Sequence, residues 1–396
     1  MLPVGNPAIG EDFVDREDEI KDIIKYIQKD NILLVAPRRY GKTSIMRKIE
    51  EILNKKDCPT IFLDIYSVST PEEFITELAT AAFDVIKDKK SLISNLKRSC
   101  FEKLKGLDEV NISIKDLKFK FKRSLKKEIN EENWKEKGWA IFTEIKKSFD
   151  QKFICFIIDE FSECVHNIGK KDKAKAEEFL KWFRSIRMSE KHLRFILSGS
   201  VSNDRVVRNI TTLSTINDFK RVPIDGFKKK NALFVVKKVF EEEGWTYKKG
   251  IAEKIINCIG VPSVPYFLSA FLSVIQEEFD GETLNKGIIE DLYNNKLMGS
   301  HGKLYFDYYV QRLKIYYSYK EQKAAKSILK KLCQTGEILT EIAFDIFKKE
   351  TGINNYEAFK DLLSDLENDF YIKQKKNNKI IFYSKVLEDW WRLYYA

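Results

Sequence analysis

Apolar runs of strand length alternate with segments of helical period through the first half of the chain. The apolar runs predict strands at residues 32–35, 60–65, 153–158, 193–198 and 219–224. Helical patterns between them include residues 71–86, 139–149 and 173–187. Strands that alternate with helices favour an α/β fold, in which a parallel sheet carries helices on both faces.

From residue 228 onward the strand pattern stops and helical patterns follow, at residues 231–244, 249–259, 265–279 and 283–297. The last hundred residues predict three helices and then a two-stranded ribbon, 370–375 and 379–383, that turns at Asn377-Asn378. Three helices and a hairpin suggest a winged helix. We therefore expect a core at 1–226, a helical lid at 227–300 and a winged-helix domain at 301–396.

The first strand leads into a turn that is typical of a phosphate-binding loop. Its sequence is Ala36-Pro-Arg-Arg-Tyr-Gly-Lys-Thr-Ser44, with alanine where the motif has its first glycine. Inward backbone N–H groups and a helix N-terminus would hold the phosphates, Lys42 would reach the β- and γ-phosphates, and Thr43 would bind Mg²⁺. The expected nucleotide contacts in the loop are Ala36, Pro37, Arg38, Arg39, Tyr40, Gly41, Lys42, Thr43 and Ser44. The alternative is a chance Gly-Lys-Thr in a basic chain, but a strand before it and a helix after it favour ATP binding.

A second apolar run ends in two carboxylates, Asp159 and Glu160, as a central strand buried on both faces would. Placed beside the loop strand, this strand would bring Asp159 to the Mg²⁺ on Thr43. Glu160 would then polarise the water that attacks the γ-phosphate. A strand that simply ends in a charged turn is the alternative. The expected catalytic residues are Glu160, Lys42 and Asp159.

Composition places the chain among soluble globular proteins, because 43% of its residues are hydrophobic and 33% are charged. The longest apolar run, 153–158, is far too short for a membrane span, and the N-terminus lacks the pattern of a secretory signal. The six cysteines are scattered without a C-x-x-C pair, which favours reduced thiols in the cytoplasm. We expect no membrane partner.

Residues 88–137 form a basic insertion with 15 Lys or Arg and 9 Asp or Glu, a net charge of +6. Within it, the alternation at 117–122 predicts a short strand. The candidate contacts to a DNA backbone are Lys118, Lys120, Lys122 and Arg123. A solvated insertion without a ligand is the alternative.

The third helix of the expected winged helix, 356–368, is acidic, which disfavours base recognition in the major groove. Lysines of the ribbon, including Lys375 and Lys376, could still contact a phosphate backbone without reading its sequence. The aromatic segment 305–319 could stack nucleobases or pack between the lid and the winged helix.

Several motifs together resemble those of archaeal-type ATPases of the AAA+/STAND group, which are related to origin-recognition-like initiators. The resemblance covers nearly the whole chain. It rests on Phe13-Val-Asp-Arg-Glu17, the loop at 36–44, Ile157-Ile-Asp-Glu-Phe161, Ile196-Leu-Ser-Gly-Ser200, Gly260-Val-Pro262 and Asp389-Trp-Trp391.

This resemblance implies further site residues. Phe13 and Val14 would border the adenine, and the turn with Pro262 would bring the lid over the base. Ser198 or Ser200 would be the polar sensor near the γ-phosphate, and Asp64 would occupy the switch position after the second strand. Arg205 and Arg208 are candidates for an arginine finger toward a neighbouring subunit, with structural or surface arginines as the alternative. Many relatives carry a C-terminal nuclease-like domain, for which this chain leaves no room, so we expect no nuclease chemistry.

Two functions remain open on the sequence. In the first, ATP binding and hydrolysis drive a conformational switch that acts with DNA or a nucleoprotein partner, in a homo-oligomer or with another protein. In the second, the chain is a slow nucleotide-gated signalling or scaffold module whose winged helix binds protein. The basic insertion favours the first, whereas the acidic third helix and the lack of an evident sensor arginine in the lid favour the second.

Overall fold

The computed structural model describes residues 7–8, 10, 13–36, 38–99, 101, 113–150, 152–199, 203–281, 283–300 and 302–396. Its contacts divide the chain into two compact units. The sheet unit comprises residues 17–35 and 45–222. The C-terminal unit comprises residues 223–396 together with the described parts of 1–16 and 36–44. The expected three-part division of the chain stays a prediction.

The sheet unit is built on five strands in the order β2-β3-β4-β1-β5. They span Asn31–Val35 (β1), Thr60–Asp64 (β2), Ile154–Asp159 (β3), Leu193–Leu197 (β4) and Phe219–Pro223 (β5). β1 pairs with β4, β4 with β3 and β3 with β2, each in parallel. The predicted α/β fold is therefore confirmed. The expectation that β3 lies beside the loop strand β1 was wrong, because β4 lies between them.

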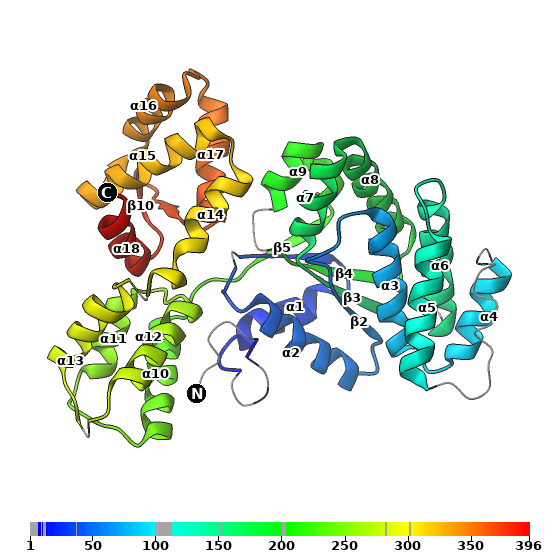
Figure 1. Ribbon diagram of the computed structural model, residues 1–396, viewed down its shortest axis with the longest axis horizontal. Coiled ribbons are helices and arrows are strands. Elements are labelled where there is room, and N and C mark those ends of the chain that lie inside the picture. The colour runs from blue at the N-terminus through cyan, green and yellow to red at the C-terminus, as the bar shows by residue number, and fades with distance from the viewer. Residues whose placement is uncertain are drawn as a thin grey trace. The chain divides into compact units, whose positions relative to one another are not determined.

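Helices cover both faces of this sheet. α1 (Glu17–Tyr26) and α2 (Lys42–Lys55) lie on one face, and α7 (Phe161–Lys171) and α8 (Lys173–Ser189) lie on the other (Figure 1). An aromatic cluster joins the second face to α8 and to α6 (Trp134–Ser148): Phe183 packs edge-on to Phe195 of β4, and Phe142 packs edge-on to Phe156 of β3. All six residues of β3 are buried, as the continuous apolar run predicts.

Local signals explain where the helices begin. α3 (Pro71–Val85) starts at a proline, and the hydroxyl of Thr70 accepts a hydrogen bond from the Glu73 N–H. Asp172 caps α8 in the same way, by accepting from the Lys175 N–H. α9 (Asn203–Ile210) and a short 3₁₀ helix (Leu213–Ile216) complete the connection from β4 to β5.

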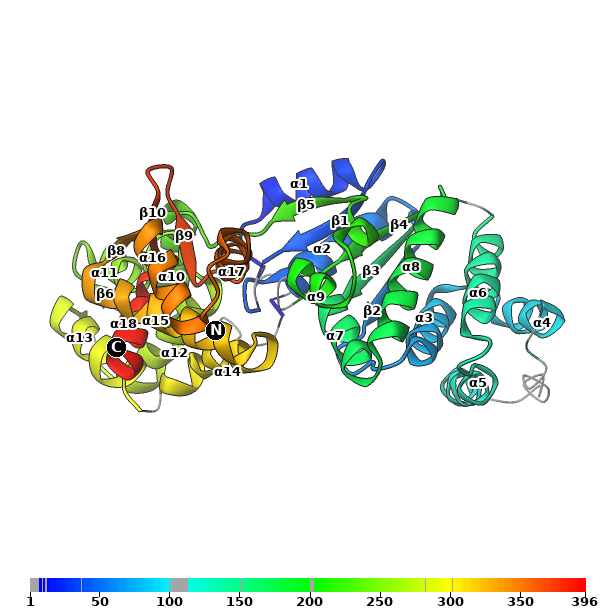
Figure 2. The same cartoon turned by 90° about the horizontal axis from the view of Figure 1, so that it is seen from above.

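The basic insertion follows α3 and contributes α4 (Lys89–Ser99) and α5 (Ile114–Glu128), and its last residues form the first turn of α6. The predicted strand at 117–122 was wrong, because this segment is part of α5. Ser113 caps the helix, and the buried Phe121 and Leu125 are four residues apart on one face, a helical spacing. α5 lies beside α3 on the side away from the sheet (Figure 2).

The first part of the C-terminal unit is helical, with α10 (Lys229–Glu243), α11 (Ile251–Ile259) and α12 (Pro265–Glu278). The single helix expected at 283–297 was wrong. Thr283–Leu284 (β7) pairs with Thr246–Tyr247 (β6), after which α13 (Lys286–Asp291) continues into a π-helical turn, Leu292–Leu297. Asn285 fixes the later start, because its side chain accepts the Ile288 N–H.

The last part contains α14 (Asp307–Tyr316), α15 (Tyr319–Thr335), α16 (Thr340–Thr351), α17 (Tyr356–Asn368) and α18 (Lys385–Tyr395). The strands Glu337–Leu339 (β8), Ile372–Gln374 (β9) and Lys379–Phe382 (β10) form an antiparallel sheet in the order β8-β10-β9. The expected ribbon is therefore present, and α17 has the expected bounds, whereas the winged-helix assignment stays a prediction. Within the described chain, no helix is both long and apolar enough to span a bilayer.

Candidate functional site

The segment after β1 has the turn geometry that the phosphate-loop motif predicts. Gly41 has a φ of +83°, a conformation that glycine adopts without the steric cost a side chain would meet. α2 begins at the next residue, Lys42, so a helix N-terminus directly follows the turn. Ala36 is buried and Arg38 is exposed, while Pro37 lies outside the described residues. This arrangement offers backbone N–H groups and a helix dipole to an anion.

The side chains of Lys42 and Ser44 form hydrogen bonds with the protein backbone. The Nζ of Lys42 donates a hydrogen bond to the carbonyl oxygen of Ala36, 2.8 Å away, so its ammonium group lies over the loop backbone. The hydroxyl of Ser44 accepts a hydrogen bond of 2.9 Å from the Ala8 N–H. Thr43, at the second position of α2, is half-buried. The loop therefore carries its cation and its hydroxyl groups at one helix start.

Tyr40 of the loop is a core residue of the C-terminal unit. Its side chain is fully buried and stacks on the ring of Phe370, with centroids 4.9 Å apart and an interplanar angle of 26°. Tyr383 packs edge-on at 6.2 Å. Burial raises the pKa of Tyr40 well above its ordinary value, so the phenol stays neutral. A role for Tyr40 in phosphate binding would therefore use its backbone.

Arg39 precedes it with a φ of +74° and contacts aromatic rings of the same unit. Its guanidinium lies 4.0 Å from the ring centroid of Tyr266 and 5.5 Å from that of Tyr308. Such contacts are attractive because the ring faces carry partial negative charge. Two successive loop residues are thus held by aromatic side chains of α12 and of the region from α14 to β10.

Arg16 joins the predicted adenine-binding segments to the loop. Its guanidinium donates a hydrogen bond of 3.4 Å to the Tyr40 carbonyl and lies 5.0 Å from the ring of Phe227. Phe227 in turn exchanges two backbone hydrogen bonds with Ser263, the neighbour of Pro262. Phe13, Val14 and Pro262 are half-buried. The structure therefore brings the 13–16 segment, the loop and the Pro262 turn together in one unit.

The two acidic residues at the C-terminal end of β3, Asp159 and Glu160, lie in the sheet unit. Asp159 is buried, and its Oδ1 accepts hydrogen bonds from the Ser198 hydroxyl and from the Glu160 N–H, the latter at 3.0 Å. Ser198 is fully buried at the end of β4, and its carbonyl accepts the Phe161 N–H at 2.7 Å. Of the two predicted sensor residues, Ser198 thus contacts Asp159, and Ser200 lies outside the described residues.

Glu160 occupies the left-handed region, with a φ of +58°, at the start of α7. Such a conformation is uncommon for a residue with a side chain, and it turns the chain sharply from β3 into α7. The separate roles predicted for Asp159 and Glu160 stay predictions. Asp64 pairs in register with Asp159, but it is exposed, and its Oδ1 accepts the Tyr66 N–H at 3.1 Å.

Gly199 permits a close approach between β4 and α7. A Cβ added there would lie 2.0 Å from the hydroxyl oxygen of Ser162, a distance that no side chain can tolerate. The glycine therefore allows the end of β4 to lie against α7, next to the hydrogen bond between Ser198 and Asp159.

Arg205 and Arg208, the predicted arginine-finger candidates, lie on α9. Arg205 is buried and Arg208 is half-buried. The neighbouring Asp204 pairs with both Nη atoms of Arg221. The arginine-finger role stays a prediction.

The predicted DNA contacts lie on α5 and in the ribbon. Lys118 pairs with Asp84 at 2.6 Å and Lys122 with Glu77 at 2.7 Å, both acids belonging to α3. Lys120 and Arg123 are exposed on α5. In the ribbon, Lys375 lies 3.6 Å from Glu337, and Lys376 is exposed.

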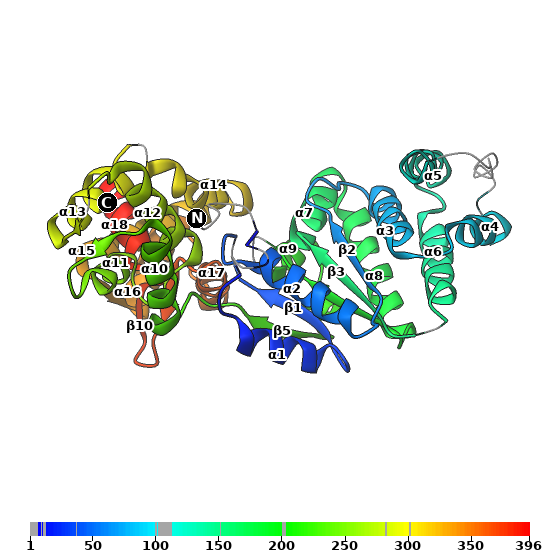
Figure 3. The same ribbon diagram turned by 90° about the horizontal axis from the view of Figure 1, so that it is seen from below.

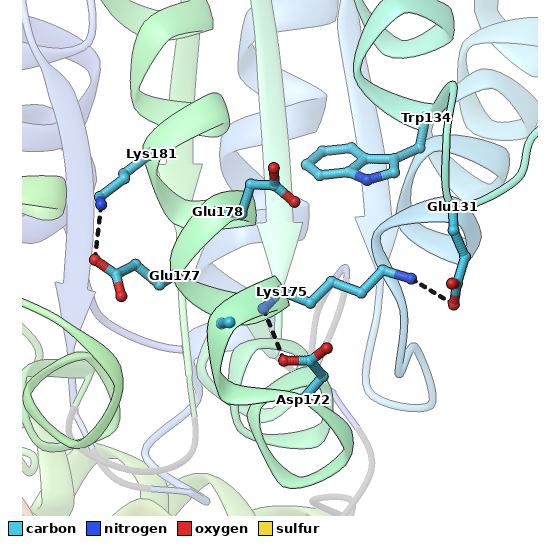
Figure 4. Close-up of a pocket in the computed structure, with 8 residues that line it drawn as sticks. Glu131, Trp134, Asp172, Lys175, Glu177, Glu178 and Lys181 are labelled. Carbon is cyan, nitrogen blue, oxygen red and sulfur yellow. Dashed lines mark hydrogen bonds and ion pairs between the residues drawn. The ribbon is translucent and has the colours of Figure 1, made fainter.

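A pocket of 520 Å³ in the sheet unit involves none of the predicted residues. It is lined by α8, Trp134 of α6 and Glu131 in the preceding loop (Figure 4). Several of its charged groups are paired: Lys175 binds Glu131 at 2.9 Å, and Lys181 binds Glu177 at 2.7 Å. We assign it no ligand.

The sequence did not identify Phe370, Tyr383 or Phe227 as neighbours of the loop segments. No motif links these residues to Tyr40 or Arg16, because the contacts depend on the tertiary fold. Arg16 itself stands within the Asp-Arg-Glu motif at 15–17, and that signal could have identified it.

Comparison with known proteins identifies the family and the fold of the chain. Residues 13–264 match the family of ATPase domains found predominantly in Archaea. The Walker-type ATPase PABY2304 of Pyrococcus abyssi has the same fold, with a TM-score of 0.65 over 99% of each chain at 16% identity. The ORC2 protein of Aeropyrum pernix, in its ADPNP–ADP complexes, gives a TM-score of 0.53 at 10% identity, over 94% of this chain and 92% of that one. No curated protein sequence matches the chain. The family match covers more than half of the chain, which therefore belongs to the archaeal ATPase domain family.

Proposed function

We propose that this AAA+-type ATPase binds ATP with Mg²⁺ through the loop 36–44 and hydrolyses it with Asp159 and Glu160. The observation that carries this proposal is the shared edge of the sheet. Val35 ends β1, immediately before the loop, and Asp159 ends β3, with the end of β4 and Ser198 between them. In open parallel sheets, ligands bind beyond the carboxyl ends of the strands.

The residues present suit a nucleotide with Mg²⁺. Hydroxyl and carboxylate oxygens are the ligands that Mg²⁺ prefers, and Thr43 and Asp159 supply them. The Ser198 hydroxyl and the Glu160 N–H orient the Asp159 carboxylate by binding one of its oxygens. When bound, Mg²⁺ would neutralise charge on the β- and γ-phosphates.

In this proposal, some side chains bind the nucleotide and another takes part in catalysis. Lys42 would place its ammonium group on the β- and γ-phosphates, moving from the carbonyl of Ala36 that it now binds. Phe13, Val14 and Pro262 would border the base, with Arg16 holding their segments to the loop. Glu160 would accept the proton of the attacking water.

We further propose that nucleotide state changes the conformation of the chain for a DNA or nucleoprotein partner. The net charge of +10 and the exposed cations of α5 support a polyanionic partner. The second candidate is a slow nucleotide-gated signalling or scaffold module whose winged helix binds protein rather than DNA. The exposed acids Glu357 and Asp361 on α17 favour it, because they would repel a phosphate backbone.

The proposal also includes assembly of the chain into a homo-oligomer. Arg205 or Arg208 would then complete the site of a neighbouring subunit. Turnover per chain that rises with protein concentration, and falls when the responsible arginine is replaced with alanine, supports this arrangement. Turnover that is independent of concentration contradicts it.

Two substitutions test the ATPase proposal by separating binding from hydrolysis. Lys42→Ala should abolish tight binding of a fluorescent ATP analogue, because the loop loses the cation that reaches the phosphates. Glu160→Gln should retain binding but hydrolyse ATP at least about tenfold more slowly. Lys48→Ala is the matched control, since it removes a charge from the exposed side of the same helix, where Lys48 pairs with Glu51.

The pattern of results decides the assignments. Unchanged affinity in Lys42→Ala would show that the loop does not bind the phosphates. Wild-type turnover in Glu160→Gln would move the role of base to another residue, and Asp64 would be the first to test.

A further inference from the structure

α5 has two faces of different chemistry. The inner face packs on α3 through the buried Phe121 and Leu125, and Phe121 stacks on Phe83 with centroids 5.0 Å apart. The outer face consists of Lys115, Asp116, Phe119, Lys120, Arg123, Lys126 and Lys127, all of them exposed. The 3.6-residue period places these seven on the side of the helix opposite the buried pair. α5 lies at the periphery of the sheet unit, beside α3 (Figure 3).

The cations at the edge of the inner face are already neutralised within the protein. Lys118 binds Asp84 and Lys122 binds Glu77, and the four side chains are 31–49% exposed. These pairs fasten α5 to α3, and a DNA contact by either lysine would have to break its pair. Two of the four α5 residues predicted to contact DNA are therefore poorly placed for it.

The outer face carries five cations and one acid. The acid is Asp116, whose carboxylate accepts the Ser113 hydroxyl at the start of the helix. Lys115, Arg123 and Lys126 have no acidic partner among the residues that the structure describes. Along the helix, Lys115 and Lys126 are about 16 Å apart, which is long enough to follow several phosphates of one strand.

Phe119 stands among these cations with 68% of its surface exposed. A ring among cations suits a strand of nucleic acid, since bases stack on the ring while phosphates meet the charges. A helix that lies on a membrane needs a broad apolar face, whereas the outer face of α5 has one apolar side chain. The combination therefore favours nucleic acid over a lipid surface.

We propose that the outer face of α5 binds the phosphate backbone of DNA, with Phe119 stacking on an unpaired base. This proposal names the surface that would contact the DNA partner, and it rests on the DNA-binding part of the function proposed above. The phosphate contacts carry no base information, so binding is independent of sequence. Single strands gain the stacking contact, and duplexes use the charges alone.

The experiment compares two double variants that lose the same charge. Arg123→Gln with Lys126→Gln alters the outer face, and Lys118→Gln with Lys122→Gln alters the paired lysines. Binding to labelled oligothymidylate and to a duplex of random sequence is measured against salt concentration, without nucleotide. The outer variant should flatten the slope of log affinity against log salt by about 1.8 on duplex and about 1.4 on single strands. The inner variant should leave the slope nearly unchanged.

Substitutions of Phe119 form the second part of the experiment. Phe119→Ala should weaken binding to oligothymidylate on the order of five- to hundredfold and leave duplex binding nearly unchanged. Phe119→Tyr keeps a ring and should bind as the wild type does. Circular dichroism should match the wild type for all these variants. Melting should match it for the outer-face and Phe119 variants and fall slightly for the inner variant, because each exposed ion pair contributes at most about 1 kcal/mol.

Three outcomes would overturn the proposal: no binding to either DNA at low salt, equal loss of slope in the inner and outer variants, or Phe119-dependent binding to phosphatidylserine vesicles in place of DNA. ATP hydrolysis is measured on the same variants and should be unchanged. A failure of the DNA contact is thereby distinguished from a failure of the ATPase proposal.

Discussion

The hydroxyl of Ser198 at the end of β4 donates a hydrogen bond to the buried carboxylate of Asp159 at the end of β3. The two strands pair in register up to Ile158 and Leu197, so the hydrogen bond closes the carboxyl edge of the sheet where the pairing ends. A buried carboxylate needs such donors, because removal from water penalises its charge. Ser198 therefore orients Asp159 in addition to any contact with a nucleotide.

Ser198→Ala should lower the free energy of unfolding by about 1–3 kcal/mol, because it removes a donor from a buried charge. It should also raise the Mg²⁺ concentration needed for half-maximal ATP hydrolysis, since the carboxylate loses its fixed orientation. Urea denaturation and a Mg²⁺ titration of turnover measure the two effects. Ser185→Ala is the control: its hydroxyl donates to a carbonyl of its own helix on an exposed face, so little change is expected. Equal effects in both variants would contradict the role given to Ser198.

Tyr40→Ala should destabilise the C-terminal unit by about 3 kcal/mol, because it empties a fully buried aromatic site. Tyr40→Phe keeps an aromatic ring stacked on Phe370, so it should lose far less stability than Tyr40→Ala. Tyr319→Ala makes the same change at a residue that is 69% exposed, and should be nearly neutral. Thermal and chemical unfolding of the three variants provide the measurement. If Tyr40→Ala were as stable as Tyr319→Ala, the stacking would not contribute to stability.

His166 on α7 should make stability fall in mild acid. Burial, and to a smaller extent Lys170, lowers the pKa of His166 to about 4. The unfolded chain, with a histidine pKa near 6.5, thus binds more protons than the folded chain between about pH 6.5 and pH 4. The folded state therefore loses stability as the pH falls through this window, by about 1–2 kcal/mol after allowance for solvent screening of a half-buried group.

The check is urea denaturation at pH 7 and pH 4.5 for the wild type and for His166→Gln. The variant lacks the titrating group, so it should lose less stability over this interval. Carboxylates contribute equally to both proteins and cancel in the difference. The same pH dependence in both proteins would exclude His166 as its source.

The sequence was sufficient for features that depend on short-range patterns. Apolar runs predicted the five strands, and the loop motif predicted a helix after the loop, which is α2. The order of the strands was not accessible in this way. The insertion of β4 between β1 and β3 depends on how distant segments pair, and no local pattern records it.

The basic insertion shows how an error in predicted secondary structure changes which cations are chosen as candidate contacts. In a strand, Lys118, Lys120 and Lys122 would share one face, because side chains alternate with a period of two. In the observed helix, Lys118 and Lys122 turn toward acids of α3, and Lys120 turns away. The charge of the segment was evident from the sequence, but the choice of cations that face solvent required the helical period.

The burial of Tyr40 has a thermodynamic consequence for the whole chain. Tyr40 belongs both to the proposed phosphate loop and to an aromatic cluster with Phe370 and Tyr383. A change in the conformation of the loop therefore alters the packing of the cluster, and the reverse also holds. Linkage is reciprocal: if ATP shifts the melting of the cluster, then loosening the cluster must shift the affinity for ATP by the corresponding free energy. A partner that engages the β9–β10 ribbon, next to Phe370, would then act as an effector of nucleotide affinity without touching the nucleotide.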